Sequence, residues 1–240
     1  MNAIATDPRA FLDRHRYALL FFSLLLTVAI GPLLETMNFG RNVMEAFLAM
    51  NLIAAVFPIV LKGERRTLFV LIGLAVVLRW ISARGAHAPL ASIFAAITWG
   101  AIALVAAYRA VRFSLSSVRI DAERIYAALS AYLLIGVCWG VAYAAMTRAM
   151  PGSLLSGGVV PPAGVGMGDA IYFSFVTLAT LGYGDLVPAT PAMRGLAVLE
   201  AVIGQLYLAL LVARLVGLHT AAHTMNPTPT NACIDERRTP

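Results

Sequence analysis

One segment, Thr180-Leu181-Gly182-Tyr183-Gly184-Asp185, combines two glycines with oxygen-bearing side chains in an otherwise apolar chain. Glycine enters left-handed backbone conformations without steric cost, so Gly182 and Gly184 allow neighbouring residues to alternate between ordinary and mirror-image conformations. Such alternation points successive carbonyls in one direction, where rings of carbonyl oxygens can replace the water shell of a cation. The Thr180 hydroxyl adds one more oxygen. The chemistry to expect of this segment is the coordination of a dehydrated cation.

A short helix is expected to position this segment. Residues 170–181 are apolar enough to enter a membrane, and Asp169 is the predicted N-cap of a helix of about three turns over residues 170–179. Its C-terminal end, near Thr180, would turn partial negative charge toward a cation. Non-helical backbone at membrane depth must be buried in protein or line a water-filled path. The pattern therefore predicts a re-entrant loop, with a helix leading in and an extended strand leading out.

The composition indicates an integral membrane protein. The chain has 240 residues, 60% hydrophobic and 12% charged, against about 25% charged in a typical soluble domain. Apolar runs approach or exceed the roughly 17–25 residues that a spanning helix needs. The predicted fold is all-α, with the re-entrant helix between the last two of six spans, at residues 17–34, 43–61, 67–83, 88–108, 125–146 and 192–217. A cleaved signal peptide is the alternative for the first span, although its apolar run is long for one.

Basic residues set the expected orientation. With the N-terminus in the cytoplasm, 13 of the 18 Lys and Arg residues lie on the cytoplasmic side. We therefore expect a multi-pass protein of the cell membrane with both termini cytoplasmic, and the compact form suits a bacterial inner membrane. The basic residues sit at the ends of apolar runs rather than in a stripe, which argues against a nucleic-acid partner. The two cysteines, Cys138 and Cys233, form no disulfide or zinc pattern.

The expected domains follow from these spans. A four-helix transmembrane unit comes before a pore domain, and polar segments flank both units. The divisions are a cytoplasmic head at 1–16, the four-helix unit at 17–112, a cytoplasmic connector at 113–124, the pore domain at 125–219 and a disordered cytoplasmic tail at 220–240.

Thr180 to Asp185 resembles the selectivity-filter signature of potassium channels, and residues 172–179 resemble their pore helix. The similarity covers residues 121–217, whereas residues 1–120 resemble that family only in helix count. The resemblance implies that potassium is held by the Thr180 hydroxyl and by the carbonyls of Thr180, Leu181, Gly182 and Tyr183, in a filter that ends at Gly184. It also implies an inner-helix hinge at Gly204 and a homotetramer. A tetramer is expected independently, because one filter segment per chain cannot encircle an ion and the sequence holds no internal repeat.

Other residues are assigned to filter support, and some of them depart from the family pattern. Tyr172 stands where tryptophan is common, and its hydroxyl is expected either to bond Asp185 or to serve as an interfacial aromatic group. Val176 replaces a glutamate that pairs, in some relatives, with the equivalent of Asp185. Leu181 replaces the commoner valine. The support assignments are Asp185, Tyr172, Thr177 and Glu200.

The expected function is passive, potassium-selective permeation, with no enzyme activity, no soluble substrate and no cofactor besides the permeant potassium ions. The fourth span is apolar, with Arg109 and Arg112 only at its end, so we expect no voltage sensor. The alternatives are a weakly selective monovalent cation channel and a potassium transporter subunit. His219 and His223, spaced i, i+4 after the last span, are either a pH- or metal-sensing ring or ordinary interfacial histidines.

Overall fold

The computed structural model describes residues 15–35, 50, 89–116, 121–161 and 164–224. The expected spans at 43–61 and 67–83, nearly all of the head and most of the tail lie outside the described residues. The elements in chain order are α2 (Arg16–Glu35), α5 (Pro89–Leu115), α6 (Ala122–Ala149), β1 (Leu154–Ser156), α7 (Met167–Leu178), β2 (Leu186–Pro188) and α8 (Pro191–Thr224).

Four long helices occupy the positions of four of the six expected spans. Within the described residues, two stretches are long and apolar enough to cross a membrane, Ala122–Ala149 of α6 and Pro191–Leu218 of α8. The apolar part of α2, Arg16–Ile30, is shorter. The described fold is therefore mostly helical, with two helices that satisfy the length and composition of a membrane span.

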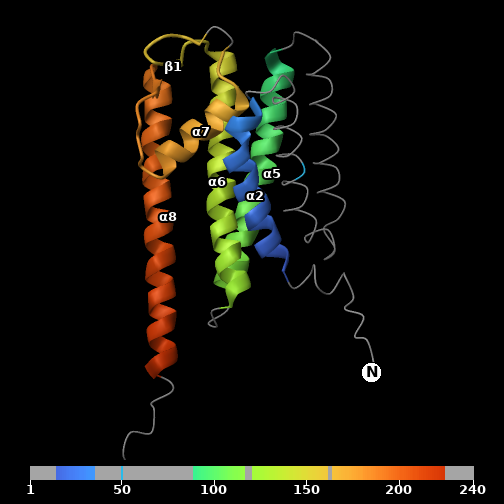
Figure 1. The fold of residues 1–240 in the computed structure, drawn as a ribbon, viewed down its shortest axis with the longest axis vertical. Coiled ribbons are helices and arrows are strands. Elements are labelled where there is room, and N and C mark those ends of the chain that lie inside the picture. The colour runs from blue at the N-terminus through green and yellow to red at the C-terminus, as the bar shows by residue number, and fades with distance from the viewer. Residues whose placement is uncertain (1–14, 36–49, 51–88, 117–120, 162–163, 225–240) are drawn as a thin grey trace, which may run out of the picture.

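Helix α6 lies at the centre of the described helices. It packs against α2 and α5 around a cluster that includes Leu20, Leu24, Ile102 and Leu134. Helix α8 stands to one side, and the short helix α7 runs obliquely between α6 and α8 (Figure 1). This arrangement gives α7 a scaffold on both sides.

Glycines allow the two long helices to approach α7 closely. A Cβ atom added at Gly136 of α6 would lie 2.6 Å from the ring of Phe175, and one at Gly140 would lie 2.6 Å from the Ile171 side chain. Both distances are well below van der Waals contact, so these two positions on α6 accommodate only glycine without rearrangement. The position of α7 therefore depends on residues of α6 that have no side chain.

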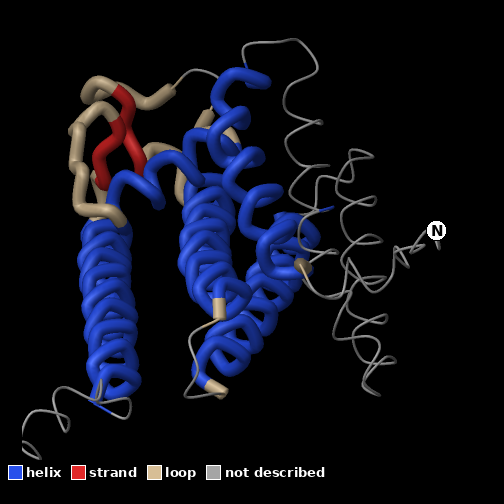
Figure 2. Tube along the Cα trace, turned by 60° about the horizontal axis from the view of Figure 1, so that its bottom comes forward, coloured by secondary structure: helices blue, strands red, loops and turns tan. Residues whose placement is uncertain are grey.

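A small antiparallel sheet corrects the all-α prediction. Strand β1 pairs with β2 in the register Leu154↔Pro188, Leu155↔Val187 and Ser156↔Leu186, and Figure 2 shows both strands at the end of the molecule where α8 begins. The Leu154 side chain is buried among Tyr143, Phe173 and Met193. Burial of that side chain and the ladder of backbone hydrogen bonds hold the segment after residue 185 to the loop that follows α6.

The start of α7 is also corrected. The N-cap is Gly166, not Asp169, and the helix begins at Met167. Asp169 lies in the first turn, where its Oδ2 accepts a hydrogen bond of 3.2 Å from the backbone N–H of Gly166. A carboxylate in this position is favourable because it faces the positive end of the helix dipole. Asp169 thus stabilises the helix terminus from inside the first turn.

Candidate functional site: the glycine loop after α7

Residues 179–185, here called the glycine loop, have an alternating backbone. The φ angles of Thr180, Gly182 and Gly184 are +57°, +55° and +80°, so every second residue is left-handed. The sequence predicted this conformation for the two glycines but not for Thr180. A left-handed conformation costs a residue with a side chain about 1–2 kcal/mol. The only sequence signal for this conformation at Thr180 was its spacing of two residues from Gly182.

The amides at the start of the glycine loop point back toward α7. The N–H of Thr180 donates to the Thr177 carbonyl at 3.0 Å, and the N–H of Leu181 donates to the Val176 carbonyl at 2.9 Å. In the described part of the chain, no hydrogen bond reaches the carbonyl oxygens of Thr180 to Gly184. Because these oxygens have no donor among the described residues, they are available to a cation.

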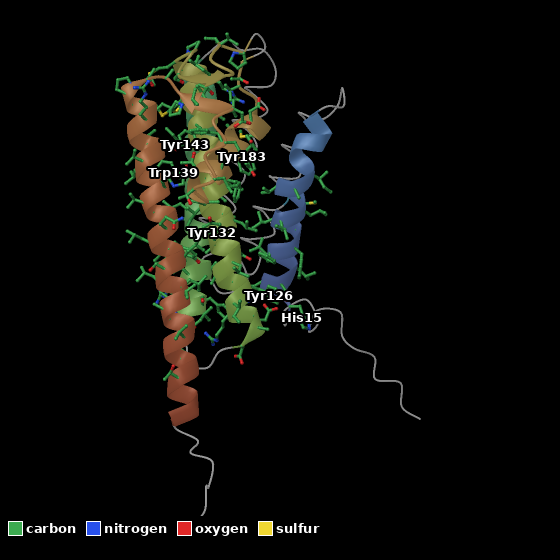
Figure 3. All side chains as sticks on the ribbon, turned by 60° about the vertical axis from the view of Figure 1, so that its left-hand side comes forward. His15, Tyr126, Tyr132, Trp139, Tyr143 and Tyr183 are labelled. Atoms are coloured by element: carbon green, nitrogen blue, oxygen red, sulfur yellow. The ribbon has the colours of Figure 1, made fainter. Side chains whose placement is uncertain are left out.

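The side chains of the glycine loop find little cover within one chain. Leu181 and Tyr183 are 56% and 69% exposed, and Figure 3 shows Tyr183 in the same half of the molecule as Tyr143. Leu181 stands where valine is commoner, and the described residues leave more than half of its larger side chain uncovered.

A hydrogen bond joins α7 to the outer end of the glycine loop. The Tyr172 hydroxyl donates to Oδ2 of Asp185 at 2.8 Å, which is the first of the two roles considered for Tyr172. This bond stabilises the ionised carboxylate and holds the pKa of Asp185 below its ordinary value. Val176, at the position where some potassium channels carry a glutamate, is buried. Its carbonyl accepts hydrogen bonds from the N–H groups of Leu181 and Gly182.

Removing the Tyr172 hydroxyl is expected to make the loop more sensitive to acid. The bond to Asp185 is fully present above the ordinary pKa of an aspartate, about 3.9, and is lost as the pH falls through the lower pKa of the folded protein. Tyr172→Phe should therefore move the pKa of Asp185 upward in an NMR titration. Tyr126→Phe, at the far end of α6, is the control. An unchanged titration would show that the bond does not hold the loop.

The sheet adds two backbone hydrogen bonds around the loop. The N–H of Gly157 donates to the Asp185 carbonyl at 3.0 Å, and the N–H of Ala189 donates to the Ser153 carbonyl at 2.9 Å. Sequence reasoning missed these contacts because a strand of three residues has no measurable periodicity. The outer end of the loop is thus held by α7 on one side and by the β1–β2 sheet on the other.

Glu200 lies behind α7 and is completely buried. Its Oε2 is 2.6 Å from the hydroxyl of Tyr143 on α6, and its Oε1 is 2.5 Å from the hydroxyl of Ser174 on α7. Glu200 was singled out in the sequence as a polar residue at membrane depth, whereas Tyr143 and Ser174 were missed. Their only signal was that they are hydroxyl residues in apolar helices.

Gly204 lies in the uninterrupted helix α8, four residues after Glu200. A Cβ atom at this position would lie 2.6 Å from the Leu178 carbonyl oxygen at the end of α7. The described structure therefore gives Gly204 a contact role, in addition to the hinge role that the resemblance implies. His219 and His223 belong to α8, and their side chains lie outside the described residues.

Comparisons with known proteins place this loop within a recognised domain. A family model described as "Ion channel" matches residues 131–220. Over 77 residues the chain is 43% identical to two pore potassium channel c of Oryza sativa subsp. japonica. These aligned residues make up 32% of this chain and 14% of that relative. No solved structure matches. The region that is similar to an ion channel domain thus contains α7, the glycine loop and nearly all of α8.

Proposed function

We propose that the chain forms a potassium-selective channel in the cell membrane, in which the glycine loops of four copies surround one pore. The observation that carries this proposal is the alternating backbone at Thr180, Gly182 and Gly184, with carbonyls that accept no hydrogen bond in the described chain. Potassium would lose its water to the carbonyls of Thr180, Leu181, Gly182 and Tyr183 and to the Thr180 hydroxyl. Permeation then needs no covalent step.

The proposed homotetramer explains two features of the single chain. One loop cannot surround an ion, so other copies must supply the remaining oxygens. Leu181 and Tyr183 are exposed in the isolated subunit, and the neighbouring subunits would cover them. The similarity of part of the chain to a potassium channel is consistent with this assembly.

The proposed channel does not sense voltage. A sensor needs several basic residues inside a spanning helix, because each charge that crosses the field contributes about 2.3 kcal/mol per 100 mV. In α5, the basic residues are Arg109 and Arg112, both near its C-terminal end. We place this end, with both chain termini, on the cytoplasmic side.

Ion flux into liposomes that hold the purified full-length protein tests the proposal. We expect potassium to enter much faster than sodium, since the carbonyl cage substitutes for the hydration shell of potassium. Equal entry of both ions would establish the weakly selective cation channel instead. Uptake that depends on a second, co-transported ion would favour a transporter subunit.

A further inference from the structure

Three short oxygen–oxygen contacts form a network at Glu200, and three hydrogen bonds need three protons. Two contacts join Glu200 to Tyr143 and to Ser174. The third joins the Oγ of Ser174 to the carbonyl oxygen of Gly136, at 2.7 Å. The Gly136 carbonyl carries no proton, and each hydroxyl carries one. Tyr143 and Ser174 therefore supply two protons for three hydrogen bonds. Only the carboxyl group of Glu200 can supply the third.

We propose that Glu200 is a neutral carboxylic acid in the assembled protein, and that it positions α7 by donating a hydrogen bond to Ser174. In this arrangement the proton on Oε1 of Glu200 is donated to the Oγ of Ser174, and Ser174 donates its own proton to the Gly136 carbonyl. The Tyr143 hydroxyl donates to Oε2 of Glu200. One chain of hydrogen bonds then connects α8, α7 and α6.

The surroundings of Glu200 favour the neutral form. The side chain is 0% exposed, and neither of its side-chain partners is a cation. A buried carboxylate without a paired cation is costly, so the group keeps its proton instead. The ionisable α6 groups that interact electrostatically with Glu200 are Tyr132, Cys138 and Tyr143, which are ordinarily neutral at pH 7. Helix α7 faces Glu200 with Ser174, and β2 has no ionisable side chain.

The neutral acid makes the position of α7 dependent on pH. The folded chain holds a proton at Glu200 that an unfolded chain releases above about pH 4.3. Folding is therefore linked to proton uptake, and the stability of the folded protein falls as the pH rises. At alkaline pH Glu200 loses its proton and with it the hydrogen bond that it donates to Ser174. The resulting carboxylate anion lies buried next to α7. The result expected for the proposed channel is a loss of potassium flux at alkaline pH.

Glu200→Gln is the discriminating variant, because an amide can donate to Ser174 and accept from Tyr143 as the neutral acid does. We expect the infrared spectrum of the wild type at pH 7 to contain the C=O stretching band of a protonated carboxyl, and Glu200→Gln to lack it. The folding equilibrium constant of the wild type should fall by up to about tenfold per pH unit relative to Glu200→Gln. Asp185→Asn, which removes an exposed carboxylate, should leave the protonated-acid band in place.

Several results would overturn the proposal. They are a wild-type spectrum without the band, a band that persists in Glu200→Gln, and an equal pH dependence in both proteins. A Glu200→Gln chain that fails to fold at pH 7 would also overturn it, because glutamine preserves all three hydrogen bonds of the neutral acid. The infrared spectrum and the stability are measured without ion flux, so these two tests do not depend on the proposed channel function. Only the expected loss of flux at alkaline pH rests on that function.

Discussion

Replacing Gly182 with alanine is expected to abolish potassium flux while the protein remains folded. At +55°, the φ angle of Gly182 is in the left-handed region, and an added Cβ would meet no atom of the described residues within 4 Å. The effect therefore comes from the backbone conformation, which costs about 1–2 kcal/mol in each chain. In the proposed tetramer the cost is roughly 4–8 kcal/mol, enough to reduce flux by about a thousandfold or more.

Gly158→Ala is the matched control for this prediction. Gly158 has a φ of +83° and equally open surroundings among the described residues, but it belongs to the turn after β1 and, among the described residues, donates no backbone hydrogen bond to the glycine loop. Its substitution carries a similar local conformational cost and leaves the carbonyls of the glycine loop in place. Potassium flux into liposomes should survive in Gly158→Ala and disappear in Gly182→Ala. Equal loss in the two variants would mean that the loop has no special role in permeation.

Gly204→Ala is expected to destabilise the packing of α8 against α7. The new methyl group would lie 2.6 Å from the carbonyl oxygen of Leu178 and 2.8 Å from a methyl carbon of the same residue. Backbone at the end of α7 cannot yield as a flexible side chain can, so the cost should be at least the roughly 1–3 kcal/mol of an overpacked core. The measurement is the thermal unfolding midpoint in detergent, together with potassium flux.

Gly195→Ala, on the same helix, separates this contact from a simple change in helix flexibility. Nothing in the described part of the chain lies within 4 Å of a Cβ at Gly195, so alanine there should increase helix stability by up to about 1 kcal/mol. If Gly204 served only as a hinge, alanine would stiffen α8 and alter gating without lowering the unfolding midpoint. An unchanged midpoint in Gly204→Ala would therefore exclude the packing role.

The sequence allowed the helical framework to be predicted, because long apolar runs and turn-forming glycines are local signals. The positions of α6 and α8, the short helix before residue 179 and the left-handed Gly182 and Gly184 follow from such signals. The bond between Tyr172 and Asp185 was one of two expectations, since both residues could be aligned with a known pattern.

The remaining contacts depend on helix packing, which local patterns do not encode. The small sheet consists of two strands of three residues with 29 residues between them, and neither strand is long enough to show alternation. The close approach of Gly136 and Gly140 to α7 depends on the relative rotation of two helices. The proton count around Glu200 requires distances among three helices. The N-cap was misplaced because Asp169 satisfies the helix terminus from within the first turn as well as it would from the cap.

The contacts that hold α7 also impose an order on biosynthesis. Its partners on α6, Gly136, Gly140 and Tyr143, are synthesised before it, whereas Glu200 and Gly204 belong to α8 and emerge afterwards. A nascent chain that ends before residue 200 lacks the acid that joins α7 to α6. Because membrane segments are delivered from the N-terminus onward, insertion of α8 is the step that completes the scaffold of α7. A chain truncated before Glu200 should therefore leave α7 accessible to protease.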